Sequence, residues 1–205
     1  MSEVPHRDPL APGLTLKSAL ESSKQAVSRR RFIRTAAIAG ATAALAPASA
    51  LAALSAPRTP RRLRLFNLHT GERLDAVYYE SGRYVGQALD AINYILRDFR
   101  QNAIKPIHPG LLDLVVAIRR RLGTEGEIAV ISGYRTPQTN AMLAAHSRGV
   151  ARHSLHVDAM ALDFRVPERT LEEVHRAAVA MRGGGVGYYP RSDFVHVDVG
   201  RVRYW

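Results

Sequence analysis

The sequence predicts an α+β fold, a single small domain with a mostly antiparallel sheet flanked by helices. Three observations predict it. The chain has 205 residues, 46% of them hydrophobic, which suits one ordinary domain and a tail. Short β-prone runs bounded by turn residues lie among segments with apolar residues at helical spacing, a mixture typical of α+β domains. The sequence contains no internal repeat, so a repeat architecture is not expected.

The first half of the domain is predicted to contain a hairpin and two helices. Residues 64–68 and 74–79 are two apolar, β-prone runs around a turn that contains glycine. Apolar residues recur at helical spacing over residues 85–100, which predicts a helix. A second helix is expected to begin at Pro109 and to stop at Gly123, because proline favours the first helical position and glycine the position after the last.

The second half is predicted to contain four strands and two helices. Thr136 and Pro137 form a helix start, and Thr170 with Glu173 forms a capping box at another. The predicted strands cover residues 127–132, 160–166, 186–189 and 194–199, and the predicted helices end near residues 146 and 183.

Charge and cysteine content narrow the possible functions. The chain carries 29 Lys and Arg against 18 Asp and Glu, a net charge of +11, and no cysteine. The absence of cysteine excludes a disulfide scaffold, an iron–sulfur cluster, a thiolate zinc site and a cysteine nucleophile. Any metal must therefore be held by histidine and carboxylate. The positive charge is typical of a polyanion binder, most often a nucleic-acid binder, if it lies on the folded domain.

The first 56 residues have the features of an export signal. A basic patch at residues 28–34, Ser-Arg-Arg-Arg-Phe-Ile-Arg, precedes an alanine-rich apolar stretch with small residues in an A-x-A arrangement. The paired arginines resemble the twin-arginine export signal of bacteria, which implies a periplasmic protein. Cleavage is expected after Ala50 or Ala52, and the sequence does not choose between them.

Two other interpretations of this segment are disfavoured. An uncleaved membrane anchor needs more Leu, Ile, Phe and Val than the stretch contains, and Pro47 interrupts it. A DNA-binding arm would not carry a hydrophobic run directly behind its arginines. We therefore expect a signal at residues 1–56, a linker at 57–62 and a folded domain at 63–205, with no transmembrane segment in the mature protein. Residues 1–56 hold seven basic and three acidic groups, so +7 of the charge belongs to the rest of the chain.

Three polar residues in apolar strands could hold a metal ion. His156 precedes a predicted strand, Asp163 lies within that strand, and His196 lies among apolar residues in the last strand. A buried carboxylate is costly unless something pairs with it, and a cation is one answer. Three ligands from histidine and carboxylate, with one open water position, are the catalytic arrangement of zinc. The alternative is that each residue is a hydrogen-bonded core residue, and spacing alone leaves both interpretations open.

A resemblance to a known family favours the metal. Residues 154–163 resemble the Ser-x-His-x-x-Gly-x-Ala-x-Asp signature of the zinc D-alanyl-D-alanine peptidases, whose fold is shared with the Hedgehog signalling domain and lysostaphin-type enzymes. Residues 132–135, 184–189 and 194–198 extend the match in the right order, and the chain is most similar to the murein endopeptidase K branch of Gram-negative bacteria. Ala159 departs from the signature, in which that position is usually glycine.

The resemblance implies a role for each matching residue. It implies that His156, Asp163 and His196 are the ligands of one zinc ion. Arg135 matches the family arginine that contacts the substrate near the reacting carbonyl, where a guanidinium can stabilise developing negative charge.

The general base stays open between two carboxylates. Some relatives place a glutamate three residues before the last histidine ligand, a position that Asp193 occupies here. Asp198 is predicted to lie on the same strand face as His196, where it is either the base or a partner that orients a histidine.

The sequence therefore predicts an exported zinc metallopeptidase that cleaves peptide cross-links of peptidoglycan, with diaminopimelate–diaminopimelate (3–3) links as the cross-link that the resemblance implies. Its expected partners are peptidoglycan stem peptides, and we expect a monomer that does not bind nucleic acid. The alternative is a zinc-containing, peptidoglycan-binding module or regulator without turnover. The charge excess on the domain is explained by an anionic cell envelope as well as by nucleic acid.

Overall fold

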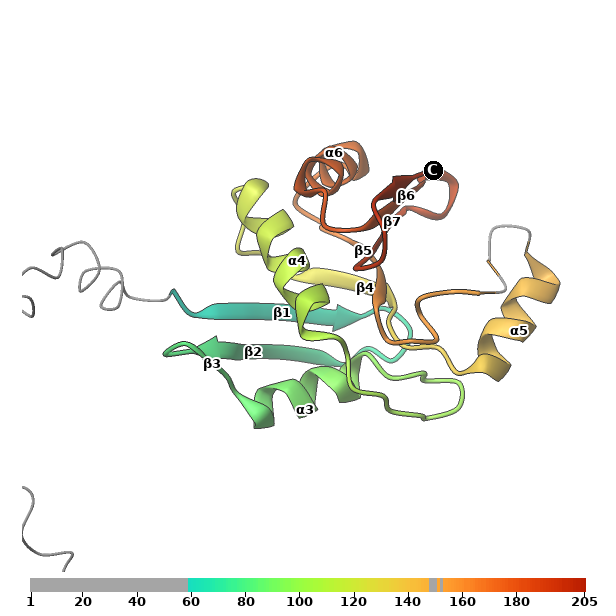
Figure 1. Ribbon diagram of the computed structural model, residues 1–205, viewed down its shortest axis with the longest axis horizontal. Helices are drawn as coiled ribbons and strands as arrows, with labels where there is room; N and C mark the ends of the chain where they lie inside the picture. The colour runs from blue at the N-terminus through green and yellow to red at the C-terminus, as the bar shows by residue number, and fades with distance from the viewer. Residues whose placement is uncertain (1–58, 148–150, 152) are drawn as a thin grey trace, which may run out of the picture. The chain divides into compact units, whose positions relative to one another are not determined.

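A computed structural model describes residues 59–147, 151 and 153–205 (Figure 1). The predicted export signal, residues 1–56, lies outside the described residues. The expected linker extends too far, because the first strand already begins at Arg61. None of the described helices is both long enough and apolar enough to span a membrane.

The described residues contain eight strands in one sheet and four α-helices, labelled as in Figure 1. The strands are β1 (Arg61–Asn67), β2 (Arg73–Glu80), β3 (Arg83–Tyr84), β4 (Ile128–Ser132), β5 (Ala161–Arg165), β6 (Gly185–Tyr189), β7 (Phe194–Asp198) and β8 (Arg203–Tyr204). The helices are α3 (Gly86–Ile95), α4 (Pro109–Arg121), α5 (Pro137–His146) and α6 (Leu171–Met181), with a 3-10 turn at Pro190–Ser192.

The sheet confirms the predicted α+β class. Its strand order is β3-β2-β1-β4-β5-β7-β6-β8. The pairs β1–β4 and β6–β8 are parallel, and the other five are antiparallel. The central strands β4, β5 and β7 are neighbours although long segments separate them in sequence, so residues far apart along the chain meet at the middle of the sheet.

The alternation of side chains gives the sheet two different faces. In β1, Leu63 and Leu65 are buried, whereas Arg62 and Arg64 point to the opposite face and are exposed. The same alternation in β5 and β7 buries Leu162, Phe164, Val195 and Val197 in the hydrophobic core. Asp163 and His196 therefore lie on the face opposite to that core.

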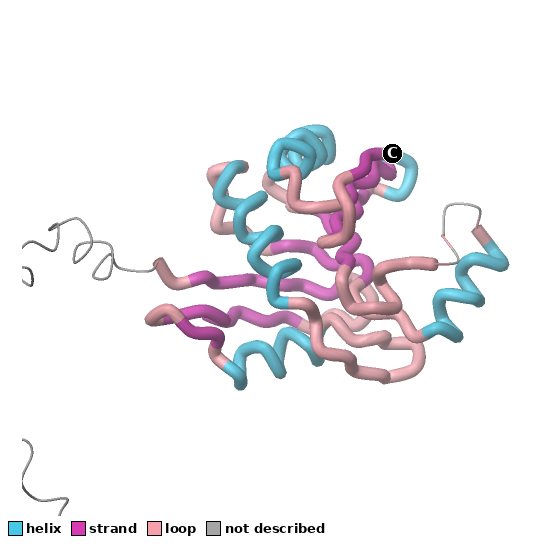
Figure 2. The backbone as a smooth tube through the Cα atoms, viewed as in Figure 1, coloured by secondary structure: helices cyan, strands magenta, loops and turns pink. Residues whose placement is uncertain are grey.

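Helices α3, α4 and α6 contribute to the core on one side of the sheet, and α5 stands apart from them (Figure 2). Their starts follow the predicted signals. Pro109 is the first residue of α4, and the Thr136 side chain caps α5 by accepting a hydrogen bond from the backbone of Thr139. The capping box of Thr170 and Glu173 is formed at the start of α6.

The helix predicted over residues 85–100 is shorter than expected. It ends at Ile95, and the chain then forms a turn closed by two backbone hydrogen bonds between Asp98 and Ala103. The reason is tertiary: the Leu96 carbonyl accepts a hydrogen bond from the backbone of Tyr134 at 2.8 Å, an interaction that a continued helix would not allow. Helical periodicity cannot reveal such a partner 38 residues away. The strands β3 and β8 were also not predicted, because two residues are too few to show alternation.

The turn after α3 positions the segment that follows β4. Asp98 is 2% exposed, and its Oδ2 atom accepts hydrogen bonds from the backbone and the hydroxyl of Thr136, both at 2.8 Å. Its Oδ1 atom accepts a hydrogen bond from the backbone of Arg100 at 3.0 Å. Asp98 therefore fixes the segment between β4 and α5 at its α5 end.

Asp98→Ala is expected to lower the free energy of unfolding by about 3 kcal/mol, because it leaves buried donors without an acceptor. Burial opposes ionisation of this carboxyl, but its hydrogen bonds outweigh burial and lower its pKa. The contribution should therefore be full above about pH 4 and should be lost as the pH falls through the folded-state pKa. Urea denaturation at pH 7 and pH 3 measures both effects. Equal destabilisation by Asp98→Ala at the two pH values would contradict this account.

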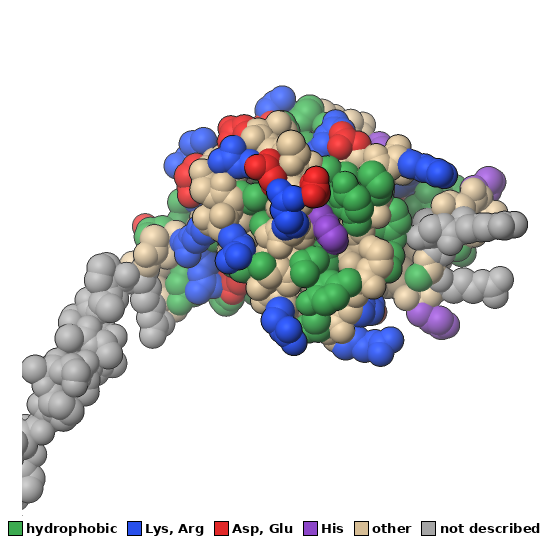
Figure 3. Space-filling model, turned by 90° about the horizontal axis from the view of Figure 1, so that it is seen from above, with side chains coloured by type: hydrophobic (Ala, Val, Ile, Leu, Met, Phe, Trp, Pro, Cys, Tyr) green, Lys and Arg blue, Asp and Glu red, His purple; other side chains and the backbone are tan. Residues whose placement is uncertain are grey.

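Basic side chains are spread over the surface and mixed with acidic ones on the face that Figure 3 shows. Several arginines are paired with carboxylates, among them Arg62 with Asp75 at 2.5 Å and Arg97 with Glu72 at 2.8 Å. Part of the arginine excess is thus used in ion pairs between elements of the domain.

Candidate metal centre

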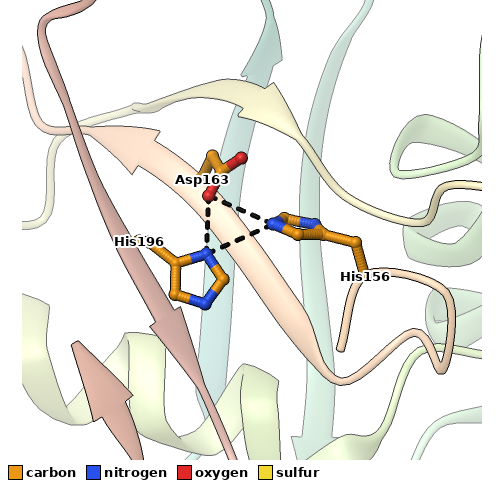
Figure 4. A group of neighbouring side chains, drawn as sticks. All are labelled: His156, Asp163 and His196. Carbon is orange, nitrogen blue, oxygen red and sulfur yellow. Dashed lines mark hydrogen bonds and ion pairs between the residues drawn. The ribbon is translucent and has the colours of Figure 1, made fainter. Parts of the chain in front are cut away.

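Three side chains from different parts of the chain meet on the open face of the sheet (Figure 4). Asp163 of β5 and His196 of β7 are register partners in adjacent antiparallel strands, so their side chains lie next to each other. His156 comes from the loop that leads into β5 and points toward the same spot. All three residues are buried, with exposed fractions of 1%, 3% and 8% for His156, Asp163 and His196.

The distances between the three side chains suit a small cation. His156 Nε2 lies 3.2 Å from His196 Nδ1 and 3.1 Å from Asp163 Oδ1, and His196 Nδ1 lies 2.8 Å from that oxygen. Ligand atoms about 2.0–2.1 Å from a tetrahedral zinc ion are about 3.3 Å from one another. Within the described part of the chain, no other group of three such side chains is close enough to share a metal ion.

Hydrogen bonds orient the ring of His156. Its Nδ1 atom lies 2.7 Å from the carbonyl oxygen of Gly133, which can only accept, so Nδ1 carries the proton. The Nε2 lone pair is therefore directed at Asp163 and His196. A side chain at Gly133 would meet the backbone of Leu96 at 2.5 Å, so glycine is needed for this close approach.

The ring of His196 is oriented in the opposite sense by Asp198. Its Nε2 atom donates a hydrogen bond to Asp198 Oδ2 at 3.1 Å, which leaves the Nδ1 lone pair for a metal. Asp198 is fully buried, and Arg203 donates to both of its oxygens, at 2.7 and 3.1 Å. The backbone of Gly185 and of Gly200 also donates to it. Asp198 lies behind the histidine and does not face the open side of the site.

The pKa shifts of the three side chains favour a negatively charged carboxylate beside the two histidines. Burial lowers the pKa of His156. Burial opposes the ionisation of Asp163, but His156, His196 and Arg135 outweigh it and hold the pKa of this carboxyl well below its usual range. For His196, burial opposes protonation, but the hydrogen bonds to Asp163 and Asp198 outweigh it and raise its pKa. The Asp163 carboxylate is thus ionised, His156 is held neutral, and a metal ion would compete with a proton for Nδ1 of His196.

Arg135 contacts the second oxygen of Asp163. Its Nη2 atom donates to Asp163 Oδ2, and its Nε atom donates to the Ser132 hydroxyl at 2.7 Å. Because Oδ2 is occupied in this way, Oδ1 is the carboxylate oxygen that faces the two histidines. The resemblance implies that Arg135 contacts the substrate near the reacting carbonyl, and the structure places it in the cavity beside the three candidate ligands.

The loop that carries His156 is a tight turn with one strained residue. The backbones of Val157 and Asp158 donate to the carbonyl oxygens of Ser154 and Leu155, at 3.0 and 3.2 Å. Ala159 has φ +55°, in the left-handed region where glycine is favoured. This conformation costs an alanine about 1 kcal/mol relative to glycine, which explains why the family signature prefers glycine at this position. The departure at Ala159 changes none of the three candidate ligand residues.

The ligands lie in a cavity of about 300 Å³. Residues that line it from the second half of the chain include Tyr189, Phe194, Arg203 and Trp205, of which Tyr189 and Phe194 lie in segments that extend the family match. His153, which precedes the signature segment, lines the cavity as well. Arg203 and Trp205 were missed because β8 was not predicted, and no motif marks them.

The structure does not bring Asp193 to the His156–Asp163–His196 group. Its side chain is 60% exposed and forms an ion pair with Arg165 at the end of β5. Together these two side chains line a separate surface depression that also contains Phe66. Among the residues described as lining the metal cavity, Asp163 is the only carboxylate. The assignment of Asp193 as general base stays a prediction, and so does that of Asp198.

An α+β sheet with a His–Asp–His group in a cavity on its open face is typical of a metallohydrolase, which makes this protein a candidate for that class. Residues 55–205 match the M15_2 peptidase family, described as peptidoglycan L,D-endopeptidase MepK. The chain belongs to this family.

Curated relatives carry the same description. Peptidoglycan L,D-endopeptidase MepK of Escherichia coli K12 is 47% identical over 163 residues, 80% of this chain and 89% of that protein. The probable peptidoglycan L,D-endopeptidase MepK of Haemophilus influenzae is 42% identical over 160 residues, 78% of this chain and 86% of that protein. No solved structure matches the chain significantly.

Asp198→Asn is expected to weaken zinc binding about 10- to 100-fold, because the amide orients His196 less firmly than the carboxylate does. Asp193→Asn is the matched control, since it makes the same chemical change at an exposed position away from the ligands, and its zinc affinity should equal that of the wild type. Competition with a chromophoric chelator measures both affinities. Equal zinc affinity of the Asp198→Asn protein and the wild type would show that Asp198 does not position the ligand.

Proposed function

We propose that this protein is an exported zinc metallopeptidase, a murein endopeptidase that hydrolyses peptide cross-links of peptidoglycan. The observation that carries the proposal is the convergence of His156 Nε2, Asp163 Oδ1 and His196 Nδ1 in a chain that belongs to a peptidase family. The names of the curated relatives support peptidoglycan as the substrate. Such a substrate implies an extracytoplasmic site of action.

Zinc is the metal that this donor set favours. Two neutral imidazole nitrogens and one carboxylate oxygen are a common catalytic zinc set, and M15 peptidases are generally zinc-dependent. When bound, zinc lowers the pKa of a coordinated water toward neutrality and polarises the scissile carbonyl. The chain contributes the geometry: Gly133 orients His156, Asp198 orients His196, and Arg135 presents one oxygen of Asp163. We expect one zinc ion per chain.

Arg135 serves the reaction in a second way in this proposal. Its Nε and Nη2 atoms are used by Ser132 and Asp163, and its Nη1 atom has no partner among the described residues. A guanidinium held at both of these atoms is fixed in the cavity before substrate arrives. It can then stabilise the negative charge that develops on the carbonyl oxygen of the scissile amide.

Asp193 remains the proposed general base, and Asp198 is assigned to orienting His196. All the hydrogen bonds of Asp198 lie behind the histidine ring, so its carboxylate has no path to a water in the cavity. For Asp193 to act as the base, its carboxylate must leave Arg165 and turn toward the cavity past Phe194, the cavity-lining residue next to it.

We propose 3–3 cross-links as the preferred substrate, a monomeric enzyme, and export to the periplasm by the twin-arginine pathway. The first rests on the resemblance to the murein endopeptidase K branch and on the L,D-endopeptidase names of the relatives. The last rests on the arginine pair and the alanine-rich stretch within residues 1–56.

The proposal is tested with defined substrates. The zinc-loaded protein is incubated with muropeptide dimers joined by 3–3 or by 4–3 links, and the products are separated and weighed by mass spectrometry. We expect monomers from the 3–3 dimer. Faster cleavage of the 4–3 dimer would contradict the proposed preference, and an intact 3–3 dimer together with an intact 4–3 dimer would contradict the enzymatic function.

One observation favours a second candidate function, a zinc-containing module that binds peptidoglycan without turnover. No carboxylate other than Asp163 lines the described part of the cavity, so a general base is not in place. Under this alternative the protein would hold about one zinc ion per chain and bind isolated sacculi, but would release no product from them.

A further inference from the structure

The last three residues of the chain complete one wall of the metal cavity. β8 pairs in parallel with β6, with Arg203 opposite Gly185 and Tyr204 opposite Val186. The pairing continues through Trp205, whose backbone donates to the Val186 carbonyl at 3.2 Å and accepts from the Tyr188 backbone at 2.9 Å. Because side chains alternate along a strand, Arg203 and Trp205 share one face and Tyr204 points to the other.

A glycine on β6 makes room for the indole. A Cβ atom at Gly187 would lie 2.7 Å from two atoms of the Trp205 ring. Any other residue at this position would push the ring away from the sheet. Gly187 is also the register partner of His196, so the indole is seated directly beside a metal ligand.

Trp205 is held in a fixed orientation above the site. Its ring centroid lies 5.3 Å from that of His196, and its indole N–H donates to the Tyr189 hydroxyl at 2.7 Å. The Arg203 guanidinium lies 4.9 Å from the indole centroid while it binds Asp198. Tyr189 in turn stacks on Phe194, with ring centroids 4.6 Å apart.

The three aromatic rings form an apolar part of the cavity wall. Tyr189, Phe194 and Trp205 all line the cavity that contains the metal ligands and Arg135. Trp205 nevertheless remains 49% exposed. A large aromatic side chain that is fixed by several contacts and left open to a cavity is typical of a ligand-contacting surface, because it loses little conformational freedom on binding.

We propose that Tyr189, Phe194 and Trp205 form the subsite for the aliphatic side chain next to the scissile amide, with Trp205 as its main contact. This inference rests on the proposed function: in a 3–3 linked substrate the residues flanking the cleaved bond are diaminopimelates, and the methylene chain of one of them packs on the indole. The metal and Arg135 then contact the amide from the polar side, so the wall sets the position of the amide along the cavity.

The chain offers a direct probe of this subsite, because Trp205 is its only tryptophan. A 3–3 linked muropeptide dimer is titrated into His156→Ala protein, which is not expected to turn it over, and tryptophan emission is recorded alongside calorimetry. We expect a saturable shift of the emission to shorter wavelength, with the same midpoint as the heat. Calorimetric binding without any change in the emission, or no binding at all, would overturn the subsite.

Kinetics separate a substrate contact from a structural role. Trp205→Ala is expected to lower kcat/KM for the 3–3 dimer about 10- to 100-fold, mostly through KM, while zinc affinity and the melting temperature stay close to wild type. Trp205→Phe should restore most of the loss. Tyr204→Ala is the matched control, since Tyr204 is 47% exposed on the opposite face, and its kcat/KM should not change.

Two outcomes would overturn the proposal. One is a wild-type KM in the Trp205→Ala protein. The other is a loss of zinc affinity in that protein large enough to explain its lost activity. Trp205 would then only hold His196 in place and would not contact the substrate. Failure of the wild type to cleave any dimer would contradict the proposed function instead, and the emission titration would still decide whether the aromatic wall binds the peptide.

Discussion

His156→Ala is expected to abolish cross-link cleavage, with a loss of at least about a thousandfold. The substitution removes one of three ligand atoms from a site whose remaining atoms are only 2.8 Å apart. Zinc lowers the pKa of bound water from 15.7 to about 7, so even a small part of that effect on nucleophile concentration exceeds a thousandfold. Zinc content by mass spectrometry and cleavage of the 3–3 dimer measure the two losses together.

The control for this variant is His146→Ala, which removes an exposed histidine at the end of α5. That protein should keep wild-type zinc content and activity. The thermal midpoint of both variants shows whether they are folded. If a folded His156→Ala protein still cleaved the dimer at the wild-type rate, the metal centre would not take part in the reaction.

Arg135→Lys is expected to lower kcat about 100- to 1,000-fold, although the positive charge is kept. The fixed guanidinium binds Ser132 and Asp163 at the same time, which a single ammonium group cannot reproduce. The loss corresponds to removing one oriented donor from a developing oxyanion. Zinc affinity should fall less than kcat, because Asp163 Oδ1 still faces the histidines.

Ser132→Ala provides the matched comparison for Arg135→Lys. It removes only the contact to Nε and leaves the contact to Asp163, so its kcat should fall by less than about tenfold. Steady-state kinetics of both zinc-loaded variants measure the difference. An Arg135→Lys protein with wild-type kcat would show that Arg135 only balances the charge of Asp163.

The parts of the site that sequence could predict are those that depend on strand alternation. The pattern Ala-Leu-Asp-Phe-Arg places Asp163 on the face opposite to Leu162 and Phe164, and the same holds for His196 between Val195 and Val197. Two polar side chains on one sheet face are therefore predictable. Their direct register is not, because the order β5-β7-β6 depends on how the chain returns to the sheet.

The hydrogen bonds that orient the candidate ligands could not be predicted from sequence. The hydrogen bond from His156 to the Gly133 carbonyl depends on a segment 23 residues away, and that segment is itself held by Asp98 after α3. The periodicity of residues 85–100 favours one long helix and hides the turn that Asp98 needs. Local pattern and tertiary contact disagree here, and the tertiary contact determines the structure.

The glycine-rich stretch before β7 illustrates the same limit. The sequence predicts a strand over residues 186–189 but gives no reason for the glycines, whereas the structure shows that they leave space for specific partners. Gly185 leaves space for Asp198 and Arg203, and Gly187 leaves space for Trp205. Arg203 and Trp205 lie in or beside the two-residue strand β8, which no sequence pattern predicts, so the aromatic wall emerges only from the three-dimensional structure.

Cleavage of peptidoglycan cross-links is proposed to depend on a metal held by His156, Asp163 and His196. The most direct test of this dependence is mass analysis of purified sacculi digested by the protein in three states: zinc-loaded, stripped with a chelator, and reloaded with zinc. We expect the 3–3 linked dimers to disappear with the loaded protein, to persist with the stripped protein and to disappear again after reloading. Unchanged dimers with the loaded protein, or equal loss with the stripped protein, would contradict this proposal.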